Sequence, residues 1–240
     1  MYEERFYRNI ARPADLLCYG VTYKETDLWC CTKTDLRKVI EDRVFYYRHQ
    51  LEEYIRTNPI FNESLLPINH DQFAPVIVKE MISASARVGV GPMATVAGAI
   101  AEFLGRDISH LTDEYIIENG GDISIKTLRE RMILVYAKKS PFSQNIAIRI
   151  KERDKPYGVC TSSATVGHSL SLGKADAVCV IADSALFADG LATYIGNSVK
   201  SKDDIGGAIE AGKTFSNVMG LLIIVGDSLG VWGDLEITRV

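Results

Sequence analysis

The longest apolar runs of the sequence lie in its C-terminal half and predict two buried strands. The segment ADAVCVIA at 175–182 is small and apolar apart from Asp176, and VMGLLIIVG at 218–226 is apolar throughout. Runs of this length are typical of strands that are buried on both faces. The second run is also too short to cross a bilayer as a helix, so we expect no membrane-spanning segment.

Shorter runs predict further strands. Polar and apolar residues alternate through VTYKETDLW, inside one strand that we expect over 16–32, and an earlier strand is expected at 4–10. The segment 114–128 predicts two strands around a tight turn, because glycine and asparagine accept the left-handed backbone of hairpin turns. The remaining expected strands are RMILVYA at 131–137, NIAIRI at 145–150 and LEITRV at 235–240.

Apolar residues at helical spacing predict several helices. The longest begins at Thr34 or Asp35 and ends near Asn58, because the residue before a proline resists helical geometry. The loop that follows, at 59–74, is longer than most connections in compact domains. Such a loop is typical of a lid, of a subunit contact or of a disordered linker. The second of these would make the protein a homo-oligomer. The other helices are expected at 75–87, at 93–105, after Asp183 or Ser184, and at 205–213.

The order of these elements predicts an α+β fold with largely antiparallel sheets. Helices fall between groups of strands without the regular rhythm of βαβ units. With 240 residues the chain could form one large domain or two small ones. We expect a single domain over residues 1–240.

The composition is ordinary for a globular protein, with 47% hydrophobic and 24% charged residues. A net charge of −4 and a pI near 5.6 argue against a partner that is nucleic acid. The N-terminus carries charges from its third residue and has no apolar signal-peptide core, so we expect a cytoplasmic protein. The five cysteines, without a CxxC pair, predict reduced thiols and no disulfide. We expect Cys160 and Cys179 to be buried and unpaired in strands, where they contribute to packing.

The stretch from Gly158 to Asn197 holds most of the residue types that could do chemistry. On the helix expected in its second half, Asp189 and Thr193 are four residues apart and therefore share one strip of the helix surface. Small residues beside them leave room for a ligand. A carboxylate and a hydroxyl one turn apart could bind a hard cation, whereas the same spacing on an exposed helix face is typical of solvated surface.

Three motifs resemble those of the ApbE-like superfamily, whose best-known members are FAD-dependent and Mg-dependent FMN transferases. The segment ADGLAT at 188–193 resembles the ADALAT signature, and ENGGDIS at 118–124 resembles the N-GGD strand turn. CTSS at 160–163, with His168 downstream, resembles the TSG segment and its histidine. The motifs also occur in the family's order. The chain looks most similar to a shorter, uncharacterised branch of the superfamily.

This resemblance implies a T-fold-like architecture and a set of site residues. The cofactors would be FAD and Mg²⁺, with Asp189 and Thr193 as ligands of the metal, since Mg²⁺ takes only one or two protein carboxylates. His168 would be the general base, because the unperturbed pKa of histidine lies near neutrality. The residues implied to bind the flavin or another nucleotide are Asn119, Gly120, Gly121, Asp122, Thr161 and Ser162.

The chain also departs from the transferase pattern. The transferases carry a KG-x-A-x-x-D helix with a lysine that serves the active site, and the helix MATVAGAIAE has Thr95 or Val96 at that place. Residues 1–75 show no counterpart of the transferases' N-terminal wall of the flavin site. Because phosphoryl-type transfer depends on charge neutralisation, we expect no efficient FMN transfer. The alternative is a non-catalytic accessory protein built on the same scaffold. The resemblance to this branch, which is associated with anaerobes, suggests a part in assimilating sulfur into homocysteine.

A third interpretation is a Rossmann-type dinucleotide fold. Gly89, Gly91 and Ala94 satisfy the GxGxxA pattern, and Glu118 follows roughly where such a fold places a ribose-binding acid. The run before Gly89 is a poor buried strand, however, and Pro92 falls inside the phosphate turn. This interpretation is therefore the least favoured of the three.

Overall fold

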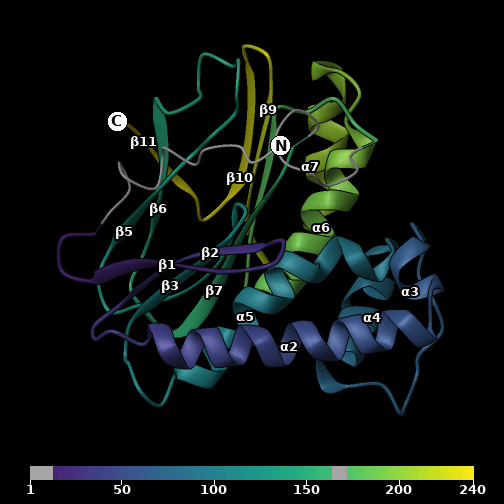
Figure 1. Ribbon diagram of the computed structural model, residues 1–240. Helices are drawn as coiled ribbons and strands as arrows, with labels where there is room; N and C mark the ends of the chain where they lie inside the picture. The colour runs from purple at the N-terminus through teal and green to yellow at the C-terminus, as the bar shows by residue number, and fades with distance from the viewer. Residues whose placement is uncertain (1–12, 164–171) are drawn as a thin grey trace.

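An antiparallel sheet of eight strands forms the centre of the computed structural model, which describes residues 13–163 and 172–240 (Figure 1). Across the sheet the strands follow the order β1-β2-β3-β4-β7-β8-β9-β10, and every neighbouring pair is antiparallel. The strands are β1 (Leu17–Tyr23), β2 (Thr26–Thr32), β3 (Tyr115–Asn119), β4 (Asp122–Thr127), β7 (Arg153–Ser162), β8 (Ala177–Ala182), β9 (Val218–Val225) and β10 (Ser228–Gly233).

A second sheet of three antiparallel strands covers one face of the large sheet. Ile146 and Ile148 from its central strand pack in one buried cluster with Ile123, Ile125 and Leu222 of the large sheet. The order of strands is β11-β6-β5. Their bounds are β5 (Arg131–Leu134), β6 (Ile146–Ile150) and β11 (Glu236–Arg239).

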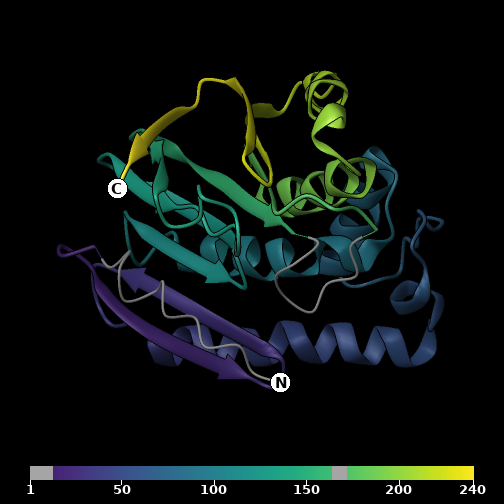
Figure 2. The same cartoon turned by 90° about the horizontal axis from the view of Figure 1, so that it is seen from above.

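Helices cover the opposite face of the large sheet (Figures 1 and 2). Figure 2 shows α2 lying along the β1–β2 hairpin, and two further clusters of buried apolar side chains join the helices to the sheet. The helices are α2 (Arg37–Thr57), α3 (Ile60–Glu63), α4 (Val76–Val88), α5 (Val96–Ile108), α6 (Ala185–Ser198) and α7 (Ile205–Lys213), with short 3-10 helices η1 (Pro92–Thr95) and η2 (Lys202–Asp204).

The alternation of side chains along β4 decides which residues face the helices. Ile123 and Ile125 belong to the cluster beneath the small sheet. Successive side chains of a strand point to opposite faces, so Asp122 and Ser124 face α5 and α6. The polar residues of this strand are therefore directed towards the helical layer, where the candidate site lies.

The α+β fold with mostly antiparallel sheets is confirmed, and most differences from the predicted elements are local. The single strand expected over 16–32 is a hairpin, because Lys24 adopts a positive φ of 52° and reverses the chain. The loop at 59–74 contains the one-turn helix α3. Strand β10 has no counterpart among the predicted strands, whereas β7 contains Cys160, which we expected in a strand. The strand expected at 4–10 lies outside the described residues.

The prediction that all cysteines are reduced is wrong for two of them. Cys18 and Cys31 lie directly opposite each other in the β1–β2 hairpin and form a disulfide. This pairing depends on the register of a hairpin that the sequence pattern had merged into one strand. Cys160 and Cys179 are buried and outside any disulfide, which confirms the expectation for both, and Cys30 is buried as well.

The dinucleotide-fold interpretation is also wrong. Gly89 ends α4 with a φ of 83°, so the segment 89–94 joins two helices and follows no strand. The described strand pairs are all antiparallel, whereas a Rossmann fold needs parallel ones. Within residues 13–163 and 172–240 no single helix is long and apolar enough to cross a membrane; α4 and η1–α5 together have the length and the apolar composition, but they are bent by 101° relative to each other.

Candidate functional site

Asp189 lies in the second turn of α6, where it is buried against the beginning of α5. The residue is 9% exposed, so the alternative of a solvated helix surface is wrong for Asp189. The carboxylate Oδ2 accepts a hydrogen bond of 2.9 Å from the backbone N–H of Gly98 in the first turn of α5. Asp189 therefore caps a neighbouring helix, at the end where backbone N–H groups carry partial positive charge.

Close approach of the two helices holds this contact in place. A Cβ on Gly98 would lie 2.3 Å from the carbonyl oxygen of Ala185 and 2.8 Å from the Cβ of Asp189. Neither distance is tolerated between non-bonded heavy atoms, and a backbone oxygen cannot rotate away. Glycine at position 98 is thus required for α5 to meet α6 at the carboxylate.

A second carboxylate, Asp122, faces Asp189 from the start of β4. Asp122 is opposite Cys160 of β7 in the sheet, and its Oδ1 accepts a hydrogen bond of 3.3 Å from the backbone N–H of Thr161. Burial, together with the negative charge of Asp122, raises the pKa of Asp189 well above its ordinary value, although hydrogen bonds from the start of α5 act in the other direction. Two carboxylates that oppose each other's ionisation make a place where a cation would be stabilised.

The turn between β3 and β4 lies beside this pair. Gly120 and Gly121 have positive φ values of 72° and 112°, and open space surrounds the position of a Cβ on Gly121. The side chain of Asn119 is 9% exposed and donates a hydrogen bond of 3.2 Å to the carbonyl of Ala97. Asn119 thus ties the turn to the beginning of α5, next to the contact between Gly98 and Asp189.

The structure separates the two residues expected from the CTSS segment. Ser162 lies on the α6 side, since a Cβ on Gly196 would be 3.3 Å from its Oγ. Thr161 is paired with Cys179 in β8, whose side chain belongs to the cluster beneath the small sheet, so the Thr161 side chain points away from Asp189. Only the backbone of Thr161 reaches the site.

Thr193 and His168 are the two remaining site residues that the sequence predicted. Thr193 is half-buried and lies one turn beyond Asp189 on α6, as the four-residue spacing requires. His168, the expected general base, lies outside the described residues.

Glu102 of α5 is a residue that the sequence analysis missed. Its Oε2 accepts hydrogen bonds from Ser184 Oγ at 2.6 Å and from the backbone N–H of Leu186 at 3.0 Å, so it caps the beginning of α6. Its other oxygen forms an ion pair with Arg106, one turn further along α5. The four-residue spacing of these opposite charges was a visible signal, but it did not point to the start of another helix.

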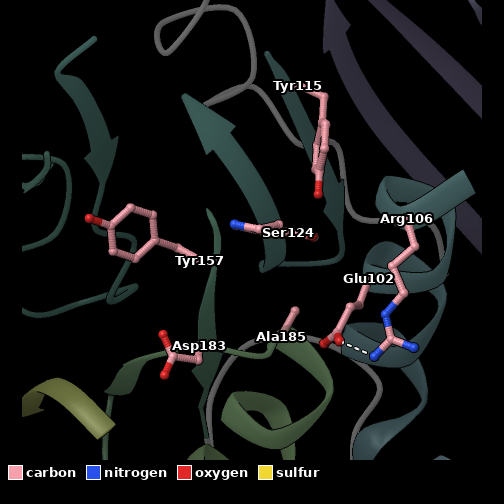
Figure 3. A pocket seen from close by; sticks show the side chains of 8 residues that line it. Glu102, Arg106, Tyr115, Ser124, Tyr157, Asp183 and Ala185 are labelled. Carbon is pink, nitrogen blue, oxygen red and sulfur yellow. Dashed lines mark hydrogen bonds and ion pairs between the residues drawn. The ribbon is translucent and has the colours of Figure 1, made fainter. Parts of the chain in front are cut away.

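A cavity of about 250 Å³ opens beyond Ala185, further along α5 than the Gly98 contact (Figure 3). It lies between α5, the strands β3, β4 and β7, and the start of α6. Its lining residues are Glu102, Arg106, Tyr115, Ser124, Pro156, Tyr157, Asp183 and Ala185. The carboxylates of Asp122 and Asp189 are not among them, so the cavity is distinct from the carboxylate pair.

The donor set around Asp189 fits a hard divalent cation in part. Within the described ranges no group of three or more His, Cys, Asp or Glu side chains could hold a metal. Mg²⁺ needs only one or two protein carboxylates when waters or phosphates complete its coordination shell. Asp122 and Asp189 could supply these carboxylates. Among the described residues, no Lys or Arg forms an ion pair with Asp189 itself, and the charged group that acts on it is the carboxylate of Asp122.

Comparisons with known proteins agree with the motifs. A family model described as AbpE bacteria matches residues 10–212. A UPF0280 protein of Methanocaldococcus jannaschii is 40% identical over 203 residues, covering 82% of each chain, and one of Methanobrevibacter smithii is 40% identical over 209 residues, covering 84% of this chain and 88% of the relative.

Two solved structures share the fold. The apo form of the flavinyl transferase ApbE of Pseudomonas stutzeri has a TM-score of 0.57 at 12% identity, covering 90% of this chain and 94% of its own. The ApbE protein of Thermotoga maritima has a TM-score of 0.58 at 11% identity, with coverage of 90% and 96%. At identities this low, the similarity shows only that the arrangement of helices and strands is shared. The chemistry of this chain therefore has to be inferred from its own residues.

Proposed function

We propose, from the premise that the chain belongs to the family described as AbpE bacteria, that it binds a divalent cation together with a flavin or another nucleotide. The cation would lie between Asp122 and Asp189, with the Thr193 hydroxyl on the same strip of α6. The nucleotide would lie against the turn formed by Gly120 and Gly121.

One observation carries this proposal: Asp189 is a buried carboxylate that lies opposite a second carboxylate, and it forms no ion pair with a Lys or Arg of the described residues. Burying an uncompensated charge costs several kcal/mol, so proteins rarely keep one without a use. A divalent cation would remove this cost by lowering the pKa of both groups. Mg²⁺ is the ion that two carboxylate oxygens and the phosphates of a nucleotide would suit best.

The residues of this chain would act mainly by binding and orientation. Asp189 is fixed by Gly98, Asp122 by the backbone of Thr161, and the turn by Asn119. A bound cation would supply charge neutralisation at the phosphates. We propose that FMN transfer is inefficient, because Thr95, one of the two residues expected in place of the transferases' lysine, is fully buried and donates its hydroxyl to the carbonyl of Pro92.

Titration of the metal-free protein with Mn²⁺, followed by electron paramagnetic resonance, tests the cation site. We expect saturable binding, competition by Mg²⁺, and loss of binding in Asp189→Asn. Asp42→Asn, an exposed residue of α2, is the matched control and should bind normally. Binding that Asp189→Asn leaves unchanged would contradict the proposal.

Absorption spectroscopy and equilibrium dialysis with FAD, with and without Mg²⁺, test the nucleotide part. We expect FAD to bind more tightly when Mg²⁺ is present, and no covalent in-gel fluorescence when a flavin-acceptor domain is added. Rapid labelling of that domain would overturn the proposal of inefficient transfer. Absence of FAD binding would restrict the proposal to other nucleotides, with ATP and NAD as the next probes.

A non-catalytic accessory protein is the second candidate, and one specific observation favours it. Asp189 already has a structural role, because it caps α5 through Gly98. If that were its only role, cations and nucleotides would not bind, and Asp189→Asn would change stability alone. We also propose that residues 1–240 form a single domain, since the eight-stranded sheet contains strands from residue 17 to residue 233.

A further inference from the structure

We propose that the outward face of α2 binds a second copy of this chain, with the two α2 helices packed antiparallel across a two-fold axis. Figure 2 shows α2 at the edge of the molecule. The residues that α2 buries against the rest of the chain recur at three- and four-residue spacing and define one side of the helix. They are Ile40, Val44, Tyr47 and Leu51. The opposite side of α2 is exposed.

The middle of this exposed side is aromatic. Phe45 and Tyr46 are 54% and 44% exposed. The ring of the exposed His49 stacks on Phe45, with 6.2 Å between the ring centroids, and Tyr46 lies one turn before His49. Tyr23 of β1 contacts the Phe45 ring edge-on at 5.5 Å, so the ring is already held in place. Neighbouring aromatic rings on a helix surface form a patch whose burial against a partner would be favourable.

Charged residues flank the aromatic patch on both sides along the helix. Lys38 and Asp42 form an exposed ion pair before it, and Glu53 and Arg56 form another after it. Successive members of the set are three or four residues apart, so they share one strip of the helix surface. In chain order the strip is Lys38, Asp42, Phe45, His49, Glu53 and Arg56.

The order of charges along this strip is complementary to itself when the strip is reversed. In an antiparallel pair centred between Phe45 and Tyr46, Lys38 lies opposite the partner's Glu53, because both are equally far from the centre. Asp42 lies opposite the partner's His49, whose ring N–H can donate to a carboxylate. The two-fold axis forms each of these contacts twice. A parallel pair would instead place every charge against its own copy, which is repulsive.

The aromatic patch would supply most of the affinity, and the charges would set the orientation. Aromatic rings bury a large area, whereas an exposed ion pair contributes little by itself. With 21 residues α2 is about 30 Å long, and one pair of such helices buries less than the roughly 800 Å² per partner of a standard interface. We therefore expect a dissociation constant in the micromolar range. The strip shares no residue with the proposed cation site.

Sedimentation equilibrium of the full chain between about 1 and 300 μM tests the inference. We expect a monomer–dimer equilibrium. Phe45→Glu should weaken the dimer by about tenfold or more, because it places a charge at the centre of the interface. Phe73→Glu is the matched control, since Phe73 is an 88% exposed phenylalanine in the loop at 59–74, and it should leave the equilibrium unchanged.

A charge exchange tests the orientation of the helices. Lys38→Glu sets like charges against each other at the partner's Glu53 and should weaken the dimer by about fivefold. Adding Glu53→Lys restores opposite charges across the two-fold axis and should recover the affinity. Circular dichroism verifies that each variant is folded.

Four results would overturn the inference. They are a monomer up to about 300 μM, a dimer that Phe45→Glu leaves intact, a dimer that Phe73→Glu dissociates, and a charge exchange that associates no better than Lys38→Glu alone.

Discussion

Glu102 on α5 and Asp189 on α6 perform the same task for each other's helix. Each carboxylate accepts a backbone N–H from the first turn of the opposite helix, Leu186 for Glu102 and Gly98 for Asp189. Their electrostatic surroundings differ in sign. Glu102 has Arg106 beside it, whereas Asp189 has the carboxylate of Asp122.

The difference separates a structural carboxylate from one that is suited to a function. A capping carboxylate gains from the partial positive charge of a helix start, and that gain is sufficient when an arginine balances the full charge. At Asp189 the same cap leaves a negative charge opposed by another one. Ionisation of Asp189 is therefore disfavoured in the metal-free protein, and a cation would favour it, which is the physical basis of the proposed binding.

The largest expected effect is that of Gly98→Ala. This substitution disrupts the close approach of α5 to α6, on which the caps by Asp189 and by Glu102 both depend. The new Cβ would lie 2.3 Å from a backbone oxygen of α6, so the helices must separate. We expect a loss of more than about 3 kcal/mol in the free energy of unfolding, measured in urea. Gly207→Ala in α7, where a Cβ meets nothing, should instead stabilise the protein by about 0.5–1 kcal/mol. Equal effects of the two substitutions would contradict this account.

Glu102→Ala should have the next largest effect. It leaves Ser184 and the N–H of Leu186 without their acceptor, and we expect a loss of about 2–3 kcal/mol in urea unfolding. Glu102→Gln keeps one acceptor oxygen and should lose about half as much. Glu53→Ala on the exposed face of α2 should cause no measurable change. A neutral result for Glu102→Ala would mean that α6 needs no cap from α5.

Asp189→Asn should act in the opposite direction in metal-free protein. The amide oxygen can still accept from Gly98 while the repulsion with Asp122 disappears, so at pH 7 we expect stabilisation on the order of 2 kcal/mol. The folded-state pKa of Asp189 is raised, so its contribution to stability is fully present below an unfolded-state pKa of about 4 and is lost as the pH rises through the folded-state pKa. The advantage of Asp189→Asn should therefore vanish near pH 4 and grow above it. Urea unfolding of both proteins between pH 4 and pH 8 measures this difference, and a constant gap would contradict it.

The smallest expected effect belongs to Thr193→Val. The substitution keeps the shape of the side chain and removes one oxygen from the strip that carries Asp189. Mn²⁺ affinity should fall by about three- to tenfold, with little change in stability. Thr57→Val at the end of α2 should leave the affinity unchanged. An unaltered affinity in Thr193→Val would remove the hydroxyl from the proposed cation site and leave the two carboxylates.

Local signals in the sequence were enough to predict the scaffold of the site. The apolar run before Asp183 predicted β8, the Ser184 cap predicted the start of α6, and the glycines of the turn predicted the β3–β4 hairpin. Each signal acts over a few neighbouring residues. The strip shared by Asp189 and Thr193 follows from helical spacing alone.

What could not be predicted depends on contacts between distant segments. Burial of Asp189 requires α5 to meet α6 at Gly98, 91 residues away in sequence, and nothing local marks that meeting. The cap by Glu102 and the disulfide of Cys18 with Cys31 depend in the same way on tertiary packing and register. Spacing along the chain specifies which residues share a face, but it does not specify what the face packs against.

The small sheet sets an order of events during synthesis of the chain. β6 ends at Ile150 and pairs with β11, which begins at Glu236. A ribosome that adds about 5–20 residues per second needs several seconds to make the intervening segment. Throughout that interval one edge of β6 has no partner strand. The nascent chain would therefore expose an unpaired strand edge to the nascent chains on other ribosomes that translate the same mRNA.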